Sequence, residues 1–190
     1  MNSIKRFFDI VLSFIAIIAF SLPMIVVSIA IKVNSKGPIL FRQQRIGKNG
    51  VHFEIYKFRS MYTETPNVST EALGDPTVYI TPIGKFIRKT SLDELPQLFN
   101  IIKGDMSIVG PRPALYNQYE LIEMRDKVNV NAVRPGLTGY AQVMGRDFIT
   151  DEEKVTYDKY YVDNMSIVFD IKIVWLTFFS VLKSEGIKMK

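Results

Sequence analysis

The most pronounced pattern in the chain is a long apolar run close to its start. Residues 10–31 form 22 consecutive positions without a charged side chain. About 20 apolar residues suffice to cross a ~30 Å hydrocarbon core, so the run predicts a membrane-associated helix. Pro23 lies in its second half, where proline removes the backbone hydrogen bond to the Ala19 carbonyl. The Ser21 hydroxyl is able to donate to backbone that such a break sets free.

The charges that flank this run bear on how it would enter a membrane. Residues 5–6 are Lys-Arg, and Lys32 and Lys36 follow the run. Basic residues mark the cytoplasmic side, so two basic flanks favour a re-entrant hairpin that bends at residues 21–23. Each arm of roughly 11 residues would then reach about half-way across the bilayer. A straight span with a kink at Pro23 is the alternative that this pattern leaves open.

The sequence pattern after the apolar run predicts an α/β fold that is mostly helical. Short strands are expected over 39–46 and 53–60, with a turn at 47–50 between them. Apolar spacing and capping residues predict four helices, over 82–89, 92–103, 114–125 and 151–162. Gly104 suits the left-handed cap after the second helix. Polar residues 63–75 predict a mobile loop and residues 134–139 a rigid turn.

A second apolar segment occupies residues 167–182. It contains Trp175, Phe178 and Phe179, and Asp170 and Lys172 interrupt it. An amphipathic helix that lies in the membrane interface suits this composition, and a core helix is the equal alternative. The chain is therefore expected to divide into a re-entrant membrane helix (1–35) and a cytoplasmic domain with interfacial C-terminal helices (36–190).

Composition excludes several classes of chemistry. The 190 residues include no Cys and one His, which removes disulfides, Cys nucleophiles and any two-His metal site. The net charge is +5, but residues 1–60 carry nine basic and two acidic side chains. A basic first third beside an apolar run indicates an anionic membrane surface rather than nucleic acid. Neither zinc-finger spacing nor a basic and aromatic RNA-binding pattern is present in the sequence.

Residues 87–114 hold the densest set of reactive groups. Asp93 and Glu94 are neighbours at the start of a predicted helix, where free N–H groups favour anions. An ionised carboxylate is able to attack phosphorus or to hold Mg²⁺. Residues 91–94 also match a capping box, in which both acids would only start the helix. Pro96 weighs against this second interpretation, because it would fall at the fifth helical position.

Four cations are candidates for binding phosphate. Arg88 precedes the acidic pair by five residues, and Arg112 lies between two prolines that stiffen its backbone. A stiffened arginine loses little entropy when it forms paired hydrogen bonds to phosphate. Lys57 and Arg59 alternate with aromatic residues and would share one face of a strand. For each of these cations a solvated surface position is the plain alternative.

Several long motifs occur in a fixed order along almost the whole chain. They are GPILFRQQRIG (37–47), YKFRSM (56–61), TSLDELPQLFNIIKGDMSIVGPRP (90–113), VRPGLTGYAQVMGR (133–146) and YYVDNMSIVFDIKI (160–173). Together they resemble the bacterial sugar transferase family, the monotopic polyprenyl-phosphate phosphoglycosyl transferases. The length is similar to the minimal form of that family, which includes phospho-N,N′-diacetylbacillosamine transferases.

The resemblance implies a membrane-bound enzyme with a covalent intermediate. Asp93 would attack the phosphorus attached to the sugar of a UDP-sugar and release UMP. Polyprenyl phosphate would then take up the sugar phosphate, as the first membrane step of bacterial glycan assembly (capsule, O-antigen, glycoprotein or exopolysaccharide). Glu94 and Asp93 would hold Mg²⁺, and Arg88 and Arg112 would hold phosphate and nucleotide. Family members often have Ser-Pro at the re-entrant break, whereas residues 21–23 here are one residue longer.

The partners that follow from this resemblance are a UDP-sugar, undecaprenyl or another polyprenyl phosphate, and membrane lipid. Nucleic acid is not expected, and a homodimer is left open. The implied location is the bacterial inner membrane, with the catalytic domain on its cytoplasmic face. A catalytically silent membrane scaffold and a soluble anion-binding or nucleic-acid-binding protein are the competing hypotheses.

Overall fold

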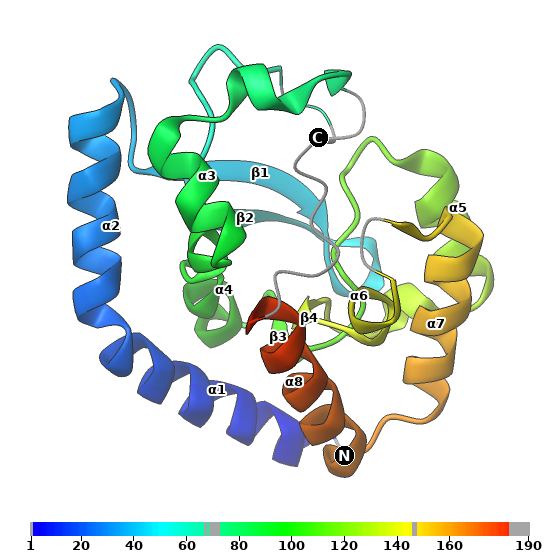
Figure 1. Cartoon of the computed structure of the whole chain (residues 1–190). Coiled ribbons are helices and arrows are strands. Elements are labelled where there is room, and N and C mark those ends of the chain that lie inside the picture. Colours follow the sequence, from blue (N-terminus) through cyan, green and yellow to red (C-terminus); the bar gives the residue numbers. More distant parts are fainter. Residues whose placement is uncertain (1, 67, 69–72, 146–147, 183–190) are drawn as a thin grey trace.

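A computed structural model describes residues 2–66, 68, 73–145 and 148–182 (Figure 1). The helices are α1 (Asn2–Ala19), α2 (Ser21–Asn34), α3 (Pro82–Lys89), α4 (Gln97–Lys103), α5 (Tyr119–Lys127), α6 (Tyr140–Met144), α7 (Asp151–Asp163) and α8 (Ile167–Leu182). The strands are β1 (Leu40–Ile46), β2 (His52–Phe58), β3 (Ser107–Val109) and β4 (Gly136–Thr138). The strands form two small two-stranded sheets, β1–β2 and β3–β4. The predicted fold class, α/β and mostly helical, is confirmed.

The N-terminal apolar run forms two helices that meet at a sharp bend. The axes of α1 and α2 differ by 62°, and no single helix among the described residues is long and apolar enough to cross a membrane. The break falls at Phe20, just before the expected residues 21–23. Pro23 is the third residue of α2, where its missing N–H leaves no helical bond unmade. The Ser21 hydroxyl donates to the Ile18 carbonyl (2.8 Å), as expected for backbone exposed at a break.

Three charged side chains attach α1 to the rest of the protein. Arg6 donates to two backbone carbonyls at the end of α4, at 2.6 and 2.9 Å. The buried carboxylate of Asp9 accepts from the Ser107 hydroxyl (2.8 Å) and from the next backbone N–H (3.0 Å). Lys5 forms an ion pair with Asp170 of α8 (2.5 Å). The polar side of α1 therefore faces the protein, and its apolar side faces outward.

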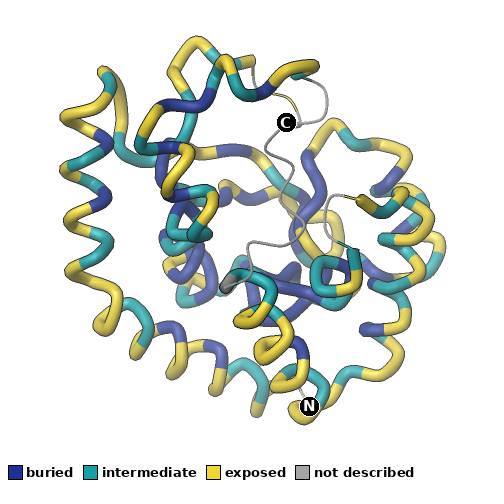
Figure 2. Tube along the Cα trace, viewed as in Figure 1, coloured by how far each residue is buried: buried dark blue, intermediate teal, exposed yellow. Residues whose placement is uncertain are grey.

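Large apolar side chains are exposed on α1, α2 and α8. In Figure 2, the side of α1 and α2 that faces away from the rest of the protein consists largely of exposed residues. On α8, Ile173 is fully buried, whereas Val168, Ile171 and Trp175 are 62–78% exposed. The core-helix alternative therefore accounts for only part of α8. Large exposed apolar surfaces mark sites of interaction with other molecules or with membranes.

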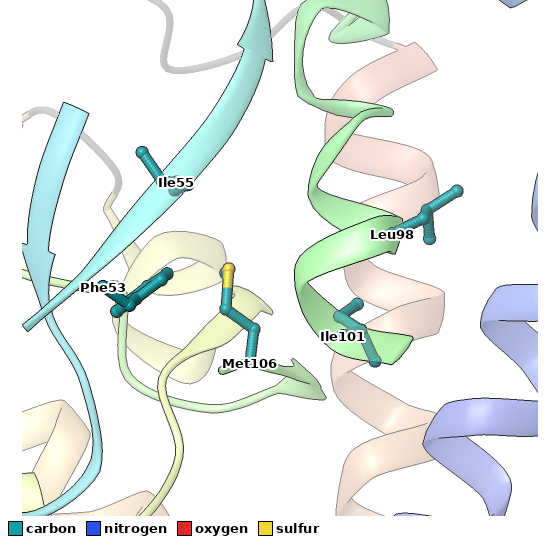
Figure 3. Packing of buried hydrophobic residues seen from close by; sticks show 5 residues of the cluster. All are labelled: Phe53, Ile55, Leu98, Ile101 and Met106. Atoms are coloured by element: carbon teal, nitrogen blue, oxygen red, sulfur yellow. The ribbon is translucent and has the colours of Figure 1, made fainter. Parts of the chain in front are cut away.

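The core lies between the β1–β2 sheet and the helices that follow it. One cluster of buried residues joins β2, α4 and the start of β3 (Figure 3), namely Phe53, Ile55, Leu98, Ile101 and Met106. A second cluster joins α2 to β2 and α3, namely Val27, Ile31, Phe58 and Ile87. Through this second cluster α2 is packed beside the strand that precedes the candidate site.

Several predicted elements are confirmed with small shifts of boundary. Strands β1 and β2 pair antiparallel from Leu40↔Phe58 to Ile46↔His52, around the expected turn. Helix α3 starts after Thr81, whose side chain accepts from the Gly84 N–H. A capping box at the start of α7 stabilises the predicted helix over 151–162.

Three predictions about the middle of the chain are wrong in part. The helix over 92–103 is divided, because Pro96 can stand just before the first residue of α4 but not inside a helix. The helix over 114–125 begins only at Tyr119. The turn at 134–139 contains strand β4, which pairs parallel with β3. Gly136 permits this pairing, because a Cβ there would lie 2.1 Å from the backbone nitrogen of Gly110.

Parts of three predictions fall on residues outside the described set. Residues 67 and 69–72 fall in the loop expected over 63–75, and residue 146 ends the family motif over 133–146. Residues 147 and 183–190 fall in the domain expected over 36–190. The division of the chain at 35/36 stays a prediction.

Candidate active site

The acidic pair lies on a short turn between two helices. Ser91 adopts a left-handed conformation (φ 55°), Leu92–Glu94 form the single 3₁₀ turn η4, and Pro96 caps α4. The Ser91 side chain makes no capping hydrogen bond, so the capping-box interpretation of residues 91–94 is wrong. Because Glu94 does not reach back to the helix start, its carboxylate is available to other side chains.

Glu94 is bound by two of the predicted cations. Its Oε1 accepts from Lys57 Nζ (2.8 Å) and from Arg112 Nη2 (3.0 Å). Burial alone would raise the pKa of Glu94, but the charges of Lys57 and Arg112 outweigh it and hold that pKa well below its ordinary range. Burial also lowers the pKa of Lys57, against the attraction of Glu94. The Glu94 cluster therefore joins β2, η4 and the Pro-Arg-Pro segment (residues 111–113).

Asp93 has a different environment from its neighbour. It is 9% exposed, and within the described part of the chain its carboxylate accepts no hydrogen bond. Burial and, to a smaller extent, the Glu94 carboxylate raise the pKa of Asp93 to about 6, against the charge of Lys57. Asp93 is therefore ionised at neutral pH, but it is less well solvated and less compensated than Glu94. A carboxylate in this state is a candidate nucleophile.

Arg88 and Arg59 occupy contrasting positions. Arg88, on the last turn of α3, is half-buried, and its charge favours ionised Asp93. Its guanidinium makes no hydrogen bond or ion pair within the described ranges. The buried guanidinium of Arg59 instead donates to the carbonyls of Ser35 (2.8 Å) and Lys36 (2.5 Å). Arg59 thus anchors the chain that leaves α2, and its role in substrate binding stays a prediction.

Two arginines that the sequence analysis did not select hold the Pro-Arg-Pro segment. Arg125 pairs with Asp158 in a buried ion pair (2.5 Å), and it also donates to the Arg112 carbonyl (2.8 Å). Arg45 donates to the Pro113 carbonyl (3.0 Å). Burial and the nearby charge of Arg112 together lower the pKa of Arg45 to about 9, against the attraction of Glu94. Arg45 is consequently a half-buried cation that lacks full compensation.

Asp93, Glu94 and the six lysine and arginine side chains just described line one cleft of about 1440 Å³. Among the described residues its wall contains nine basic side chains and two acidic ones, Asp93 and Glu94. The basic residues are Lys32, Arg42, Arg45, Lys57, Arg59, Arg88, Arg112, Arg125 and Lys154. This excess of positive charge suits a ligand with several phosphate charges. Ser21 and Pro23, at the helix break, do not line this cleft in the described part of the chain.

The acidic pair also fits one kind of metal site. No group of three or more Asp, Glu, His or Cys that could hold a metal ion occurs in the described ranges. Magnesium is commonly held by one or two carboxylates together with substrate phosphates and water. Both cations on Glu94 bind the same oxygen, Oε1, so Oε2 and the Asp93 carboxylate are the oxygens that suit such an ion.

Comparison with known proteins identifies relatives over almost the whole chain. The family model described as bacterial sugar transferase matches residues 1–184. The uncharacterized sugar transferase EpsL of Bacillus subtilis is 40% identical over 97% of this chain and 90% of its own length. The UDP-glucose:undecaprenyl-phosphate glucose-1-phosphate transferase of Escherichia coli is 44% identical over 93% of this chain. The galactosyl transferase CpsE of Streptococcus agalactiae is 41% identical over 97% of this chain. The matches span only 39% and 43% of the length of these last two proteins.

Proposed function

Because this chain belongs to the bacterial sugar transferase family, we propose that it transfers a sugar 1-phosphate from a UDP-sugar to undecaprenyl phosphate or another polyprenyl phosphate. This would be the first membrane step in the assembly of a bacterial glycan. The name of the Escherichia coli relative, a UDP-glucose:undecaprenyl-phosphate transferase, supports the reaction class. The observation that carries the proposal is the buried Asp93 carboxylate in a cleft that, among the described residues, is lined by nine basic side chains.

The reaction would proceed by two displacements at the same phosphorus. The Asp93 carboxylate attacks the phosphorus attached to the sugar, the bond from that phosphorus to the bridging oxygen breaks, and UMP leaves with the electron pair. An oxygen of polyprenyl phosphate then attacks the phosphosugar on Asp93, and the carboxylate leaves. Both substrates are anions, so Lys57, Arg88 and Arg112 would offset the repulsion between them and the carboxylate.

Asp93 and Glu94 would hold Mg²⁺ together with oxygens of the bound substrate. When bound, the ion would supply positive charge that neutralises the diphosphate. Lys57 and Arg112 keep the Glu94 carboxylate ionised, and they fix the direction in which it points.

We further propose that α1 and α2 form the re-entrant hairpin on the cytoplasmic face of the inner membrane. The bend of 62°, the basic residues at both ends of the pair and the exposed apolar side chains support this arrangement. Helix α8, with Trp175 and neighbouring apolar residues exposed, would lie in the interface. The site would then face the lipid surface at which polyprenyl phosphate presents its phosphate.

The covalent step predicts a measurable change in the mass of the protein. The purified full chain, in neutral detergent with Mg²⁺ and a panel of UDP-sugars, is expected to gain one sugar phosphate when no acceptor lipid is present. One equivalent of UMP per enzyme should appear with it. Peptide mapping should place the modification on Asp93. If no UDP-sugar gives either UMP or an adduct, the result supports the silent scaffold instead. An adduct on another residue would contradict the proposed nucleophile.

The raised pKa of Asp93 predicts the pH dependence of this first step. Because a protonated carboxyl cannot attack, the single-turnover rate of UMP release should be constant above about pH 7 and fall about tenfold per unit below about pH 6. The folded protein binds this proton more tightly than the unfolded chain, so protonation of Asp93 does not itself unfold the protein. Circular dichroism at each pH checks this point. A rate that is independent of pH over this window would contradict a raised pKa of Asp93 in the reacting enzyme.

A further inference from the structure

Helix α2 supplies one wall of the cleft as well as part of the apolar N-terminal pair. Met24, Ser28 and Lys32 all line the cleft. They are four residues apart, so they lie above one another on a single face of the helix. The neighbouring residues Val27 and Ile31 are buried against α3 and β2, which fixes the rotation of α2. The lining face therefore changes from apolar to cationic toward the end of the helix.

Apolar residues continue this wall from α2 into the cleft. Pro38, Ile39 and Leu40, at the start of β1, and Phe58, at the end of β2, belong to the same lining. Asp93 and Glu94 line the same cleft. One continuous cleft thus joins an apolar helix face, which the proposed function places against lipid, to the proposed nucleophile.

Lys32 is the cation on this face. Its Nζ donates to the Gly37 carbonyl (3.1 Å), and within the described ranges it forms no ion pair. The neighbouring cation Arg59 is different, because three hydrogen bonds to Ser35 and Lys36 occupy its guanidinium. Lys32 therefore retains two protons and a full charge for an anion that approaches along α2.

We propose that the face of α2 formed by Met24, Ser28 and Lys32 is the subsite for the acceptor lipid. The prenyl chain would lie along the apolar part of this face, and Lys32 would bind the terminal phosphate. A polyprenyl phosphate matches this order of chemistry, since it joins a long apolar chain to one anionic group. A UDP-sugar carries no apolar chain, so it gains nothing from this wall. This inference rests on the proposed function and assigns it an acceptor site.

The test separates the two half-reactions in neutral detergent micelles. Lys32→Glu, Lys32→Arg and Lys36→Glu are compared with the unchanged protein, and the last serves as the control. Lys36 is an exposed cation in the segment that follows α2, and it does not line the cleft. Formation of the phosphosugar adduct from UDP-sugar should be the same in all four proteins. For Lys32→Glu alone, the KM for polyprenyl phosphate should rise by about tenfold or more, the loss expected for a charged hydrogen bond.

The kinetic outcomes distinguish the inference from the function on which it rests. If the unchanged protein forms no adduct, the proposed function fails. If it forms one but Lys32→Glu and Lys36→Glu share the same acceptor KM, only the acceptor subsite is wrong. A Lys32→Glu protein that loses adduct formation as well would also overturn the inference, because Lys32 would then act in the first step or in folding.

Photochemical labelling provides a readout that does not depend on turnover. A polyprenyl phosphate analogue with a diazirine near the phosphate should label peptides that contain residues 24–32. Unlabelled polyprenyl phosphate should suppress this labelling, whereas phosphatidylglycerol at the same concentration should not. Labelling confined to other peptides would overturn the inference. Equal competition by phosphatidylglycerol would also overturn it, because Lys32 would then bind any anionic lipid.

Discussion

Asp93→Asn is expected to lower the rate of sugar-phosphate transfer by about 10³-fold or more, the scale of loss when a covalent nucleophile is removed. Asparagine keeps the shape of the side chain but has no carboxylate to attack phosphorus. Transfer of sugar phosphate to polyprenyl phosphate, measured with purified protein, gives the rate. Fractionation of cells should show the variant in the membrane pellet, as for the unchanged protein.

The position of Asp93 makes this variant a clean test. Its carboxylate accepts no hydrogen bond in the described part of the chain, and burial disfavours its charge. Asparagine should therefore leave thermal stability unchanged or raise it slightly. Glu123→Gln is a matched control, because Glu123 is an exposed acid of α5 paired only with Lys127 in the described ranges. Near-normal turnover by Asp93→Asn would exclude the proposed covalent mechanism.

Asp158→Asn should destabilise the protein by about 3–5 kcal/mol, because it leaves a buried guanidinium without its counter-charge. The side chains of Arg125 and Asp158 are only 4% and 1% exposed. The pair joins α5 to α7, and Arg125 also holds the Arg112 carbonyl. Chemical unfolding of the purified protein in detergent measures the loss of stability.

A matched acid on the same helix separates this effect from a general effect of charge. Asp163, at the end of α7, pairs with Lys159, and their side chains are 51% and 41% exposed. Asp163→Asn should change the stability by about 0.5 kcal/mol or less. Equal losses from Asp158→Asn and Asp163→Asn would contradict the assigned importance of the buried pair.

A double variant distinguishes stability from the positioning of Arg112. Replacing Arg125 by Met and Asp158 by Leu removes both charges and fills the space with apolar atoms, which should recover much of the stability. The KM of the double variant for the UDP-sugar should nevertheless be higher than that of the unchanged protein, because the carbonyl of Arg112 has lost its donor. Full recovery of both quantities would show that the pair is structural only.

Local patterns predicted most of the helices and the antiparallel strands correctly. Thr81-Pro82 and the apolar spacing of residues 151–162 are signals contained within a short stretch, and both helices begin where the sequence predicted them. The turn at 47–50 has the same local character. Residues 134–139 were mistaken for a turn because strand β4 exists only through its pairing with β3, which lies 29 residues earlier in the chain.

The candidate site was predicted in part for the same reason. The sequence identified Asp93, Glu94, Lys57 and Arg112 as separate candidates, and the fold places them in one cluster. It did not single out Arg45 or Arg125, because their partners at Pro113 and Asp158 are distant in the chain. An arginine has no local signature of burial, and only its tertiary contacts show whether it meets solvent or the backbone.

By itself, the sequence determined that residues 10–31 form an apolar segment and which reactive side chains the chain carries, since both follow from residue types at short spacing. Its long motifs, in their order along the chain, indicated the family. Tertiary structure alone decided which of these side chains act together. Asp93 and Glu94 are neighbours of the same chemical type, yet burial raises the pKa of one, while Lys57 and Arg112 lower that of the other. The difference arises because desolvation and Coulomb interactions depend on distance in space and not on distance along the chain.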